Sequence, residues 1–503
     1  MAITPIRFLD HDGLLNVATS DFLRKDNELS ASKNVYCYEL GKLEKVPGYL
    51  VAGNDTQVIN GQSVSQLHYY FRSAISAKSE KLLAFSNSSG NLVLKYIEPT
   101  TAAVTDWTTI TPVSGYTSMG AAKVCAVNYL DRAFIVGYVS GTTFLPNTTL
   151  LGTTLATTDG TNLTNMPQGK FIVQYRDLLY VLNAYESTTL YPNRMYWCAD
   201  PVNMAITWAN TTNYADIGFN NGDEITGAGE VLDRLIVFKR FSMWKWDESE
   251  IKEISTTGCD SHDSIKKIGS TLYWFNRTGF YRYTGSDPEC ISLKVQPFID
   301  AMDQTTLDTV KAEQHEFEYR AFIGTVTVDG VTYTNAWFCF DTRREKCYIR
   351  CTAHTAKSTA YFLESGKKRM YFGNDNGYVY KFATKVDGIY RDGQVGTNTT
   401  TGSEIDSFFV TGNLDHGVPE DTKFTVLLTA FSRNCQGLKV AVDVDNLGQF
   451  SEESKQILKK NVDTLEFGAT GNRFRYKFYE KSGDKSWEFE GFVIKTDIQS
   501  KIE

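Results

Sequence analysis

Residues 272–283 read LYWFNRTGFYRY, and this arrangement of large side chains around one polar turn decides the fold class. Aromatic and aliphatic residues crowd both ends of the stretch, and Asn276-Arg277-Thr278-Gly279 separates them. Aromatic side chains favour strands, and a polar turn with glycine tolerates the positive φ that a tight reversal needs. The stretch therefore predicts two short antiparallel strands joined as a hairpin.

The same pattern recurs elsewhere in the chain. Strand-like runs on either side of a polar turn occur at residues 82–96, 235–246 and 370–382, of which the second lacks the glycine. Residues 337–348 resemble the outer hairpin of a further unit. Runs of this kind, cut by Gly, Asn, Asp and Ser, are typical of short antiparallel strands. The sequence therefore predicts an all-β protein.

The turn glycines follow a weak period. Gly90 and Gly279 are 189 residues apart, and Gly279 and Gly377 are 98 residues apart. Division by four and by two gives about 47 and 49 residues, close to the repeat length of β-propellers. Over residues 51–390 such a period predicts an irregular β-propeller of about seven blades. A pair of large β-sandwiches is the alternative architecture that the pattern leaves open.

Residues 295–316 break the strand pattern. Apolar side chains recur there mostly every three or four residues, with Asp and Glu between them. This spacing predicts a helical insertion of one or two short amphipathic helices near residues 295–316. We expect it to be either a packed connector between blades or a surface that docks on a neighbouring subunit.

A change of composition divides the chain. Glycines and a Thr-rich tract replace the strand pattern over residues 387–403, and strand-like runs resume beyond it. We therefore expect residues 1–50 to form an N-terminal arm with the first strands that close the propeller. Residues 51–390 would form the propeller with its helical insertion. Residues 391–503 would form a C-terminal β-sandwich of ordinary domain size.

The charge balance bounds the function. The 503 residues include 51 Lys and Arg against 59 Asp and Glu, a net charge of −8. A protein that wraps nucleic acid needs a basic surface, so the balance argues against that class. It is compatible with a protein that lets nucleic acid slide past. No apolar run approaches about 18 residues, so we expect no membrane-spanning segment.

The cysteines indicate a reducing compartment. Nine cysteines are an odd number, which excludes a complete set of intramolecular disulfides. The first residues show no basic region followed by an apolar stretch, so no secretion signal is expected. Both features predict reduced thiols in a cytoplasm.

Motifs that carry chemistry are mostly absent from the sequence. The phosphate-binding loop, the dinucleotide fingerprint, His-Glu-x-x-His and Gly-x-Ser-x-Gly do not occur. We therefore predict no catalytic residues, no cofactor-binding residues and no cofactor, and we expect the protein not to be an enzyme.

Two clusters have the residue types of a metal site. Residues 443–448 begin like a calcium loop, but Leu447 replaces an oxygen ligand, so we predict a β-turn. The second cluster has the composition of a Cys₃His zinc site: Cys339, Cys347, Cys351 and His354. A hairpin that turns near residue 343 would place Cys339 opposite Cys347. The spacing is otherwise that of a strand, so we predict buried thiols and no metal.

Carboxylates near predicted turns leave one enzymatic hypothesis open. They are Asp10, Asp12, Asp216, Asp223 and Asp375. Carbohydrate-cleaving propellers set paired carboxylates around their central channel. Capping of turns is nevertheless the usual role of aspartate in such positions. A carbohydrate-binding or carbohydrate-cleaving β-propeller is therefore the alternative function.

Several short motifs resemble one family. They are residues 12–16, 34–36, 41–49, 272–285, 291–299, 409–411, 415–423, 467–476 and 487–494. One of them, GKLEKVPGY at residues 41–49, resembles a hairpin near the start of bacteriophage tail-hub proteins. These are the nozzle proteins of short-tailed phages, of the tail tubular protein B and tail-stabilisation type.

The resemblance implies a structural virion protein. Members of this family form an oligomeric ring in the tail, below the portal and adaptor, through which the genome leaves. The resemblance therefore implies a homo-oligomeric tail nozzle, assembled in bacterial cytoplasm. Its implied partners are adaptor or portal-proximal proteins, tail fibres or spikes, and genomic DNA that passes the lumen without sequence-specific binding. The missing catalytic motifs and the cysteine content are compatible with this role.

Overall fold

A computed structural model places most of the chain. It describes residues 4–499 apart from residues 9–10, 12, 22, 74–77, 100–105, 111–115, 153–154, 156–162, 203–204, 220, 249, 397–400, 418, 436, 449, 451–455 and 484–485. The regular secondary structure of the described residues is almost all β-strand, with one short α-helix and a few 3₁₀ turns. No helix among them has the length and apolarity needed to cross a membrane.

Six separate four-stranded sheets follow one another along the chain. Most of their sequential strands pair as antiparallel hairpins, as the repeated turn pattern predicts. The first sheet consists of β7 (Val64–Arg72), β8 (Ser79–Ser88), β9 (Asn91–Ile97) and β10 (Thr108–Thr109), and the second of β11 (Lys123–Tyr129), β12 (Arg132–Ser140), β13 (Thr143–Phe144) and β14 (Thr148–Leu151). The third consists of β15 (Gln168–Tyr175), β16 (Leu178–Glu186), β17 (Thr189–Trp197) and β18 (Tyr214–Asp216), and the fourth of β19 (Ile225–Val231), β20 (Arg234–Lys239), β21 (Met243–Trp246) and β22 (Ile251–Ser255). The fifth consists of β23 (Lys266–Ile268), β24 (Thr271–Asn276), β25 (Gly279–Tyr283) and β26 (Glu289–Cys290), and the sixth of β27 (Lys311–His315), β28 (Glu318–Val328), β29 (Val331–Asp341) and β30 (Lys346–Cys351).

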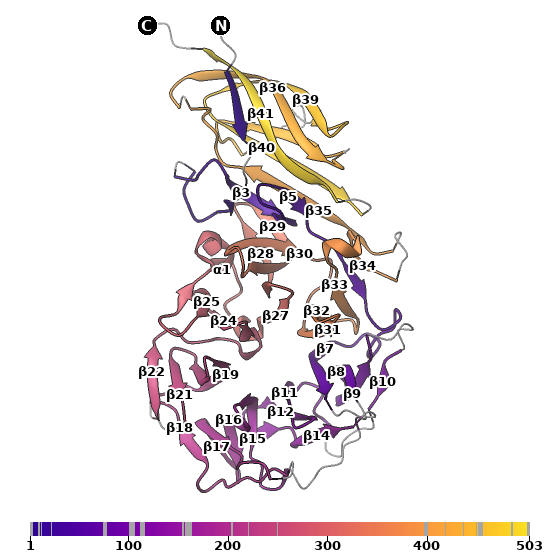
Figure 1. The fold of residues 1–503 in the computed structure, drawn as a ribbon, viewed down its shortest axis with the longest axis vertical. Coiled ribbons are helices and arrows are strands. Elements are labelled where there is room, and N and C mark those ends of the chain that lie inside the picture. The colour runs from indigo at the N-terminus through magenta and orange to yellow at the C-terminus, as the bar shows by residue number, and fades with distance from the viewer. Residues whose placement is uncertain are drawn as a thin grey trace.

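A seventh unit is completed by a strand from near the start of the chain. Strands β31 (Ser358–Glu364), β32 (Lys367–Gly373) and β33 (Val379–Phe382) pair in order, and β6 (Tyr49–Val51) pairs antiparallel with β33. Figure 1 shows these sheets arranged about a common centre, a propeller-like arrangement. The all-β class and this arrangement agree with the sequence-based prediction.

Two larger sheets lie at the other end of the molecule, close to both chain ends (Figure 1). One contains β39 (Val462–Gly471), β36 (Thr422–Arg433), β41 (Glu488–Gln499), β5 (Leu43–Lys45) and β4 (Val35–Tyr36), with β1 (Thr4–Phe8) on β41. The other is an eleven-stranded sheet that continues from the seventh unit through β6. Its strands in the end module are β34 (Arg391–Gln394), β35 (Ser403–Thr411), β40 (Phe474–Ser482), β37 (Lys439–Val444), β38 (Gln456–Ile457), β3 (Glu28–Lys33) and β2 (Leu14–Leu15). Residues of both sheets share one buried cluster, in which the rings of Phe478 and Phe489 lie 4.6 Å apart. The early strands β1, β3, β4 and β5 pair within this end module.

The helical insertion is shorter than the sequence pattern predicts. It consists of a 3₁₀ turn at Leu293–Val295, the helix α1 (Gln296–Asp300) and a second 3₁₀ turn at Leu307–Thr309. The prediction of helix as far as residue 316 is wrong, because Lys311–His315 forms β27, paired antiparallel with β28. The apolar spacing there reflects a connector and a buried strand, and tertiary pairing overrides the local period.

Asn34 joins the propeller-like part to the end module. Its backbone has φ of 57°, in the left-handed region that asparagine tolerates better than most residues. Its side-chain N–H donates to the carbonyl of Asp406 at 2.8 Å, and its side-chain oxygen accepts from the N–H of Cys351 at 2.7 Å. Its own carbonyl accepts from the N–H of Val46 at 3.0 Å. One buried residue therefore bridges β30, β35 and the GKLEKVPGY segment, the first two through its side-chain amide and the third through its backbone carbonyl.

Gly48 lies where the chain enters β6. A Cβ atom built on it would lie 1.9 Å from the carbonyl oxygen of Arg391 in β34. The next residue, Tyr49, is fully buried, and its hydroxyl lies 2.7 Å from Nδ1 of His354. Only glycine therefore allows β6 to pair with β33 on one side and β34 on the other.

We predict that Gly48→Ala destabilises the protein by about 3 kcal/mol or more, because backbone would have to move to admit the methyl group. Gly468→Ala is the matched control. Gly468 is exposed in a strand, and a Cβ there meets nothing within 4 Å. It should change the free energy of unfolding by less than about 1 kcal/mol. Urea denaturation of both variants checks this, and equal stabilities would contradict the assigned role of Gly48.

The buried histidines predict acid sensitivity. Burial lowers the pKa of His68, His262 and His416 to about 4 in the folded protein, against an ordinary value of 6.5. Below pH 6.5 the unfolded chain binds protons that the folded chain excludes, so stability falls between pH 6.5 and pH 4. Burial lowers the pKa of His315 and His354 as well. It raises the pKa of Asp26, Glu44 and Asp392, the last to about 6, and these three groups act in the opposite sense against five histidines. Urea midpoints between pH 7.5 and pH 4.5 measure this slope, and a flat profile would contradict it.

Candidate functional site

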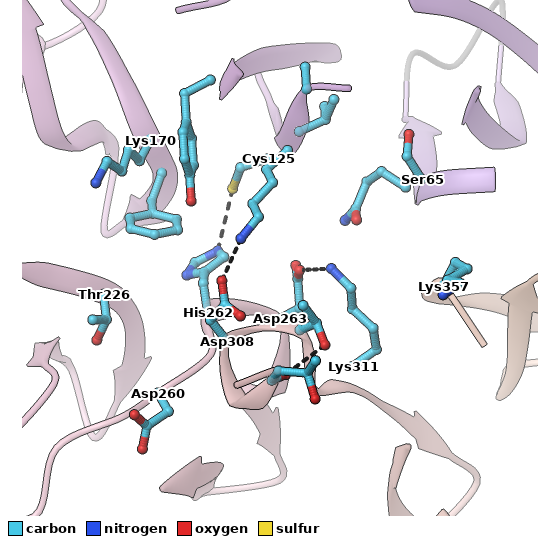
Figure 2. A pocket seen from close by; sticks show the side chains of 18 of the residues that line it. Ser65, Cys125, Lys170, Thr226, Asp260, His262, Asp263, Asp308, Lys311 and Lys357 are labelled. Atoms are coloured by element: carbon cyan, nitrogen blue, oxygen red, sulfur yellow. Dashed lines mark hydrogen bonds and ion pairs between the residues drawn. The ribbon is translucent and has the colours of Figure 1, made fainter. Parts of the chain in front are cut away.

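A cavity of about 470 Å³ lies where the first strands of successive sheets converge. Its wall includes residues of β7, β11, β15, β19 and β27, together with the 3₁₀ turns at His262–Ser264 and Leu307–Thr309. Figure 2 shows their side chains pointing into one space from different sheets. The cavity thus occupies the centre of the propeller-like part, the position at which ligands and catalytic groups are expected in such an architecture.

The wall of the cavity is strongly charged. Its cationic side chains are Lys123, Lys170, Arg240, Lys311 and Lys357, and its carboxylates are Glu224, Asp260, Asp263 and Asp308. Every one of these carboxylates is within ion-pair distance of a Lys or Arg side chain. The negative charges of the cavity wall are therefore neutralised by ion pairs.

Two contacts connect β11 to the connectors that follow β22 and α1. Nζ of Lys123 lies 2.5 Å from a carboxylate oxygen of Asp308, and both side chains are about half exposed. Sγ of Cys125 lies 3.4 Å from Nε2 of His262 (Figure 2). These contacts join sheet regions that are far apart in sequence, so the turns at His262–Ser264 and Leu307–Thr309 are held against β11.

Asp263 anchors the same region. It forms an ion pair with Lys311 of β27. Burial alone would raise the pKa of Asp263, but the charges of Lys311 and the neighbouring groups lower it to about 2. The group is therefore a carboxylate at any physiological pH, and it stabilises the local structure rather than exchanging protons.

Cys125 and His262 are placed like a thiol–imidazole pair but are not activated. Burial raises the pKa of the Cys125 thiol to about 12 and lowers the pKa of His262 to about 4. A nucleophilic cysteine needs the opposite shifts, toward thiolate and imidazolium. The ring of His262 packs on Phe171 with centroids 4.6 Å apart, as an ordinary packed side chain does.

Glu224 and Asp260 line the opposite part of the cavity. Glu224 accepts from Lys170 at 2.6 Å and from the side-chain amide of Asn183 at 2.9 Å. Burial alone would raise the pKa of Glu224, but these two partners lower it below its ordinary value. Asp260 is held by Arg277 at 2.7 Å. A glycosidic general acid needs a raised pKa, which Glu224 and Asp263 do not have.

The turn carboxylates named from sequence do not converge on the cavity. Asp216 ends β18 and accepts from Nε and Nη2 of Arg194, at 2.7 and 2.8 Å. Asp223 accepts from the backbone N–H groups of Arg240 and Phe241, so it caps a turn as predicted. Asp375 lies in the turn between β32 and β33. Asp10 and Asp12 lie outside the described residues.

The two candidate metal clusters do not assemble. Among the residues that the structure describes, no group of three or more His, Cys, Asp or Glu side chains is arranged to hold a metal ion. Cys339 pairs with Tyr348, and Cys347 pairs with Phe340, so the expected pairing of Cys339 with Cys347 is wrong by one residue. A shift of one residue places the two thiols on opposite faces of the sheet. Asp443 instead pairs with Arg475 across two strands.

The cavity residues themselves were not found from sequence. They come from seven strands and several connectors, and no motif or fixed spacing relates them. The one usable signal was the hairpin period, which predicts a shared centre but not which side chains face it.

Comparisons with known proteins identify no family. No family model and no curated protein matches the chain. Among solved structures, the AfRom2 CNH domain covers 68% of this chain and 99% of its own, with 9% identity and a TM-score of 0.37. An exo-β-1,3-galactanase from Phanerochaete chrysosporium, solved with galactose, covers 90% of this chain and 100% of its own, with 7% identity and a TM-score of 0.24. A glycoside hydrolase covers 88% and 99%, with 10% identity and a TM-score of 0.27. These TM-scores establish neither a family nor a function.

The cysteines allow a direct check of the site. Eight of the nine are buried free thiols, and only Cys290 is partly exposed. We predict that a maleimide labels Cys290 first in the native protein, and that Cys125 stays unlabelled until the protein unfolds. Peptide mass spectrometry locates the label, and Cys290→Ser should abolish the fast phase. Labelling of Cys125 as fast as that of Cys290 would mean that its thiol is activated.

Proposed function

We propose that this chain is a structural virion protein, a subunit of an oligomeric ring that forms the tail nozzle of a short-tailed bacteriophage. The proposal starts from the resemblance of residues 34–36 and 41–49 to such proteins. The genome would leave through the ring, and the adaptor and the tail fibres or spikes would be its neighbours. Assembly would take place in the bacterial cytoplasm.

One structural observation carries the proposal. Residues 41–49, which carry part of the resemblance, join the end module to the propeller-like part. In and after this segment β5 pairs with β41, and β6 pairs with β33 and β34. Gly48 and Asn34 allow and stabilise this connection. The residue types of this segment are therefore required by a particular arrangement of two modules, and not by a hairpin in general. Residues that carry the resemblance thus lie where this chain joins its two modules, which supports the proposal.

We infer a finer architecture from the same strands. The six four-stranded sheets and the unit closed by β6 would be seven blades of a propeller. The two larger sheets around both chain ends would be the sandwich expected for residues 391–503, with the N-terminal arm woven into it.

The charges suit a conduit that is built between subunits. The centre of the propeller-like part is crossed by the ion pair of Lys123 with Asp308, so it is no open passage for a duplex. A net charge of −8 keeps the outside of each subunit from gripping phosphates, which leaves DNA mobile beside it.

A carbohydrate-binding or carbohydrate-cleaving protein is the second candidate. The observation that favours it is the central cavity, whose volume of about 470 Å³ is in the range of ligand sites. The lowered pKa values of Glu224 and Asp263 favour binding over cleavage.

Ring formation tests the proposal. We expect negative-stain images and mass photometry of the purified 56.5 kDa protein to show closed rings with a central opening. Where assembly needs the adaptor, immunogold labelling of purified particles should mark the tail end. A protein that is monomeric alone and absent from particles would overturn the proposal. Release of reducing ends from polysaccharides, or saturable glycan binding, would favour the second candidate.

A further inference from the structure

The central cavity has the opposite charge to the protein as a whole. The chain carries −8, yet the cavity wall has more cations than carboxylates. One of those carboxylates, Asp260, is already neutralised by Arg277, which does not belong to the wall. The low-dielectric walls of a cavity focus the electric field of the charges that line it, so a local excess of cations there attracts anionic groups.

The excess resides in Arg240 and Lys357. Glu224 lies 2.6 Å from Lys170 but 3.9 Å from Arg240, so Arg240 is the weaker partner in a shared contact. Lys357 precedes β31 on the far side of the cavity and is exposed, and no described carboxylate lies within ion-pair distance of it. Lys123 and Lys311 are each matched by one aspartate. Two cations therefore remain for a partner from outside.

An exposed aromatic side chain adjoins this charge. Phe241 follows Arg240 directly and is 57% exposed. The guanidinium of Arg277 lies 5.1 Å from the ring centre of Phe241, and the same guanidinium binds Asp260 in the cavity wall. Large exposed aromatic residues next to arginine are typical of the centre of protein–protein interfaces.

We propose that the central cavity and its Phe241 rim form a socket for an acidic peptide segment of a partner protein. Carboxylates of the segment would enter between Arg240 and Lys357, and an apolar residue would pack on Phe241. A cavity of about 470 Å³ fits a few side chains. Nucleic acid would instead need a basic surface that follows its backbone over many phosphates. The proposal does not depend on ring formation, so the two can fail separately.

The probe is a fluorescein-labelled peptide, GDEFEDG, with two comparison peptides: GNQFQNG, which lacks the charges, and GDESEDG, which lacks the ring. We expect saturable binding of GDEFEDG to the full-length protein in fluorescence anisotropy at low salt. Binding should weaken as salt rises, because charge attraction is screened. Each comparison peptide should bind about tenfold more weakly or worse, a loss of about 1.4 kcal/mol.

Variants place the binding site. Arg240→Glu combined with Lys357→Glu should weaken GDEFEDG by about tenfold or more, and Phe241→Ser should act on GDEFEDG but little on GDESEDG. Lys252→Glu, at an exposed lysine on β22 outside the cavity wall, is the charge-matched control and should change affinity less than about twofold. Thermal unfolding confirms that each variant is folded. Three results would overturn the proposal. One is no binding of GDEFEDG at a concentration of about 1 mM, and another is an equal loss of affinity in the control variant Lys252→Glu. The third is displacement of GDEFEDG by inorganic phosphate or a DNA oligonucleotide at equal concentration.

Discussion

The pairing of β6 with β33 and β34 is the constraint on which the rest of the structure depends. Three residues, Tyr49–Val51, complete the seventh unit on one side and continue into the end module on the other. More than 300 residues separate β6 from β33 in sequence. The loop-closure cost grows only slowly with such a length, but the pairing removes a strand edge that would otherwise be open to other chains. The fully buried Tyr49 and the missing side chain of Gly48 make this crossing possible.

The strands could be predicted from sequence because their signals are local. Residues 272–283 form the expected hairpin, with Phe275 paired to Phe280 and Asn276 to Gly279. The helix expected through residue 316 could not be corrected from sequence, because what makes Lys311–His315 a strand is its pairing with β28. Alanine 312 is buried opposite Ala321, and such a contact is invisible to a search for periodicity. The role of Gly48 was visible only as part of a motif.

The central cavity could not be predicted at all. Lys123, His262 and Asp308 are more than 40 residues from one another, and they meet only because three parts of the chain converge on one centre. The carboxylates that the sequence places near turns have structural partners instead: Asp216 pairs with Arg194, and Asp223 caps a turn. What distinguishes the cavity is the sum of its charges, a property of the assembled wall.

The division of charge between the outside and the centre has a consequence for the proposed role. A subunit that is acidic overall repels DNA at long range, and the repulsion is screened over about 8 Å at physiological salt. The cations of the cavity wall are largely matched by Glu224, Asp263 and Asp308, so the wall adds only a small net positive charge to the field outside. Clustering basic side chains in the centre therefore lets one chain keep an acidic balance over the rest of its surface and still retain a cationic recess.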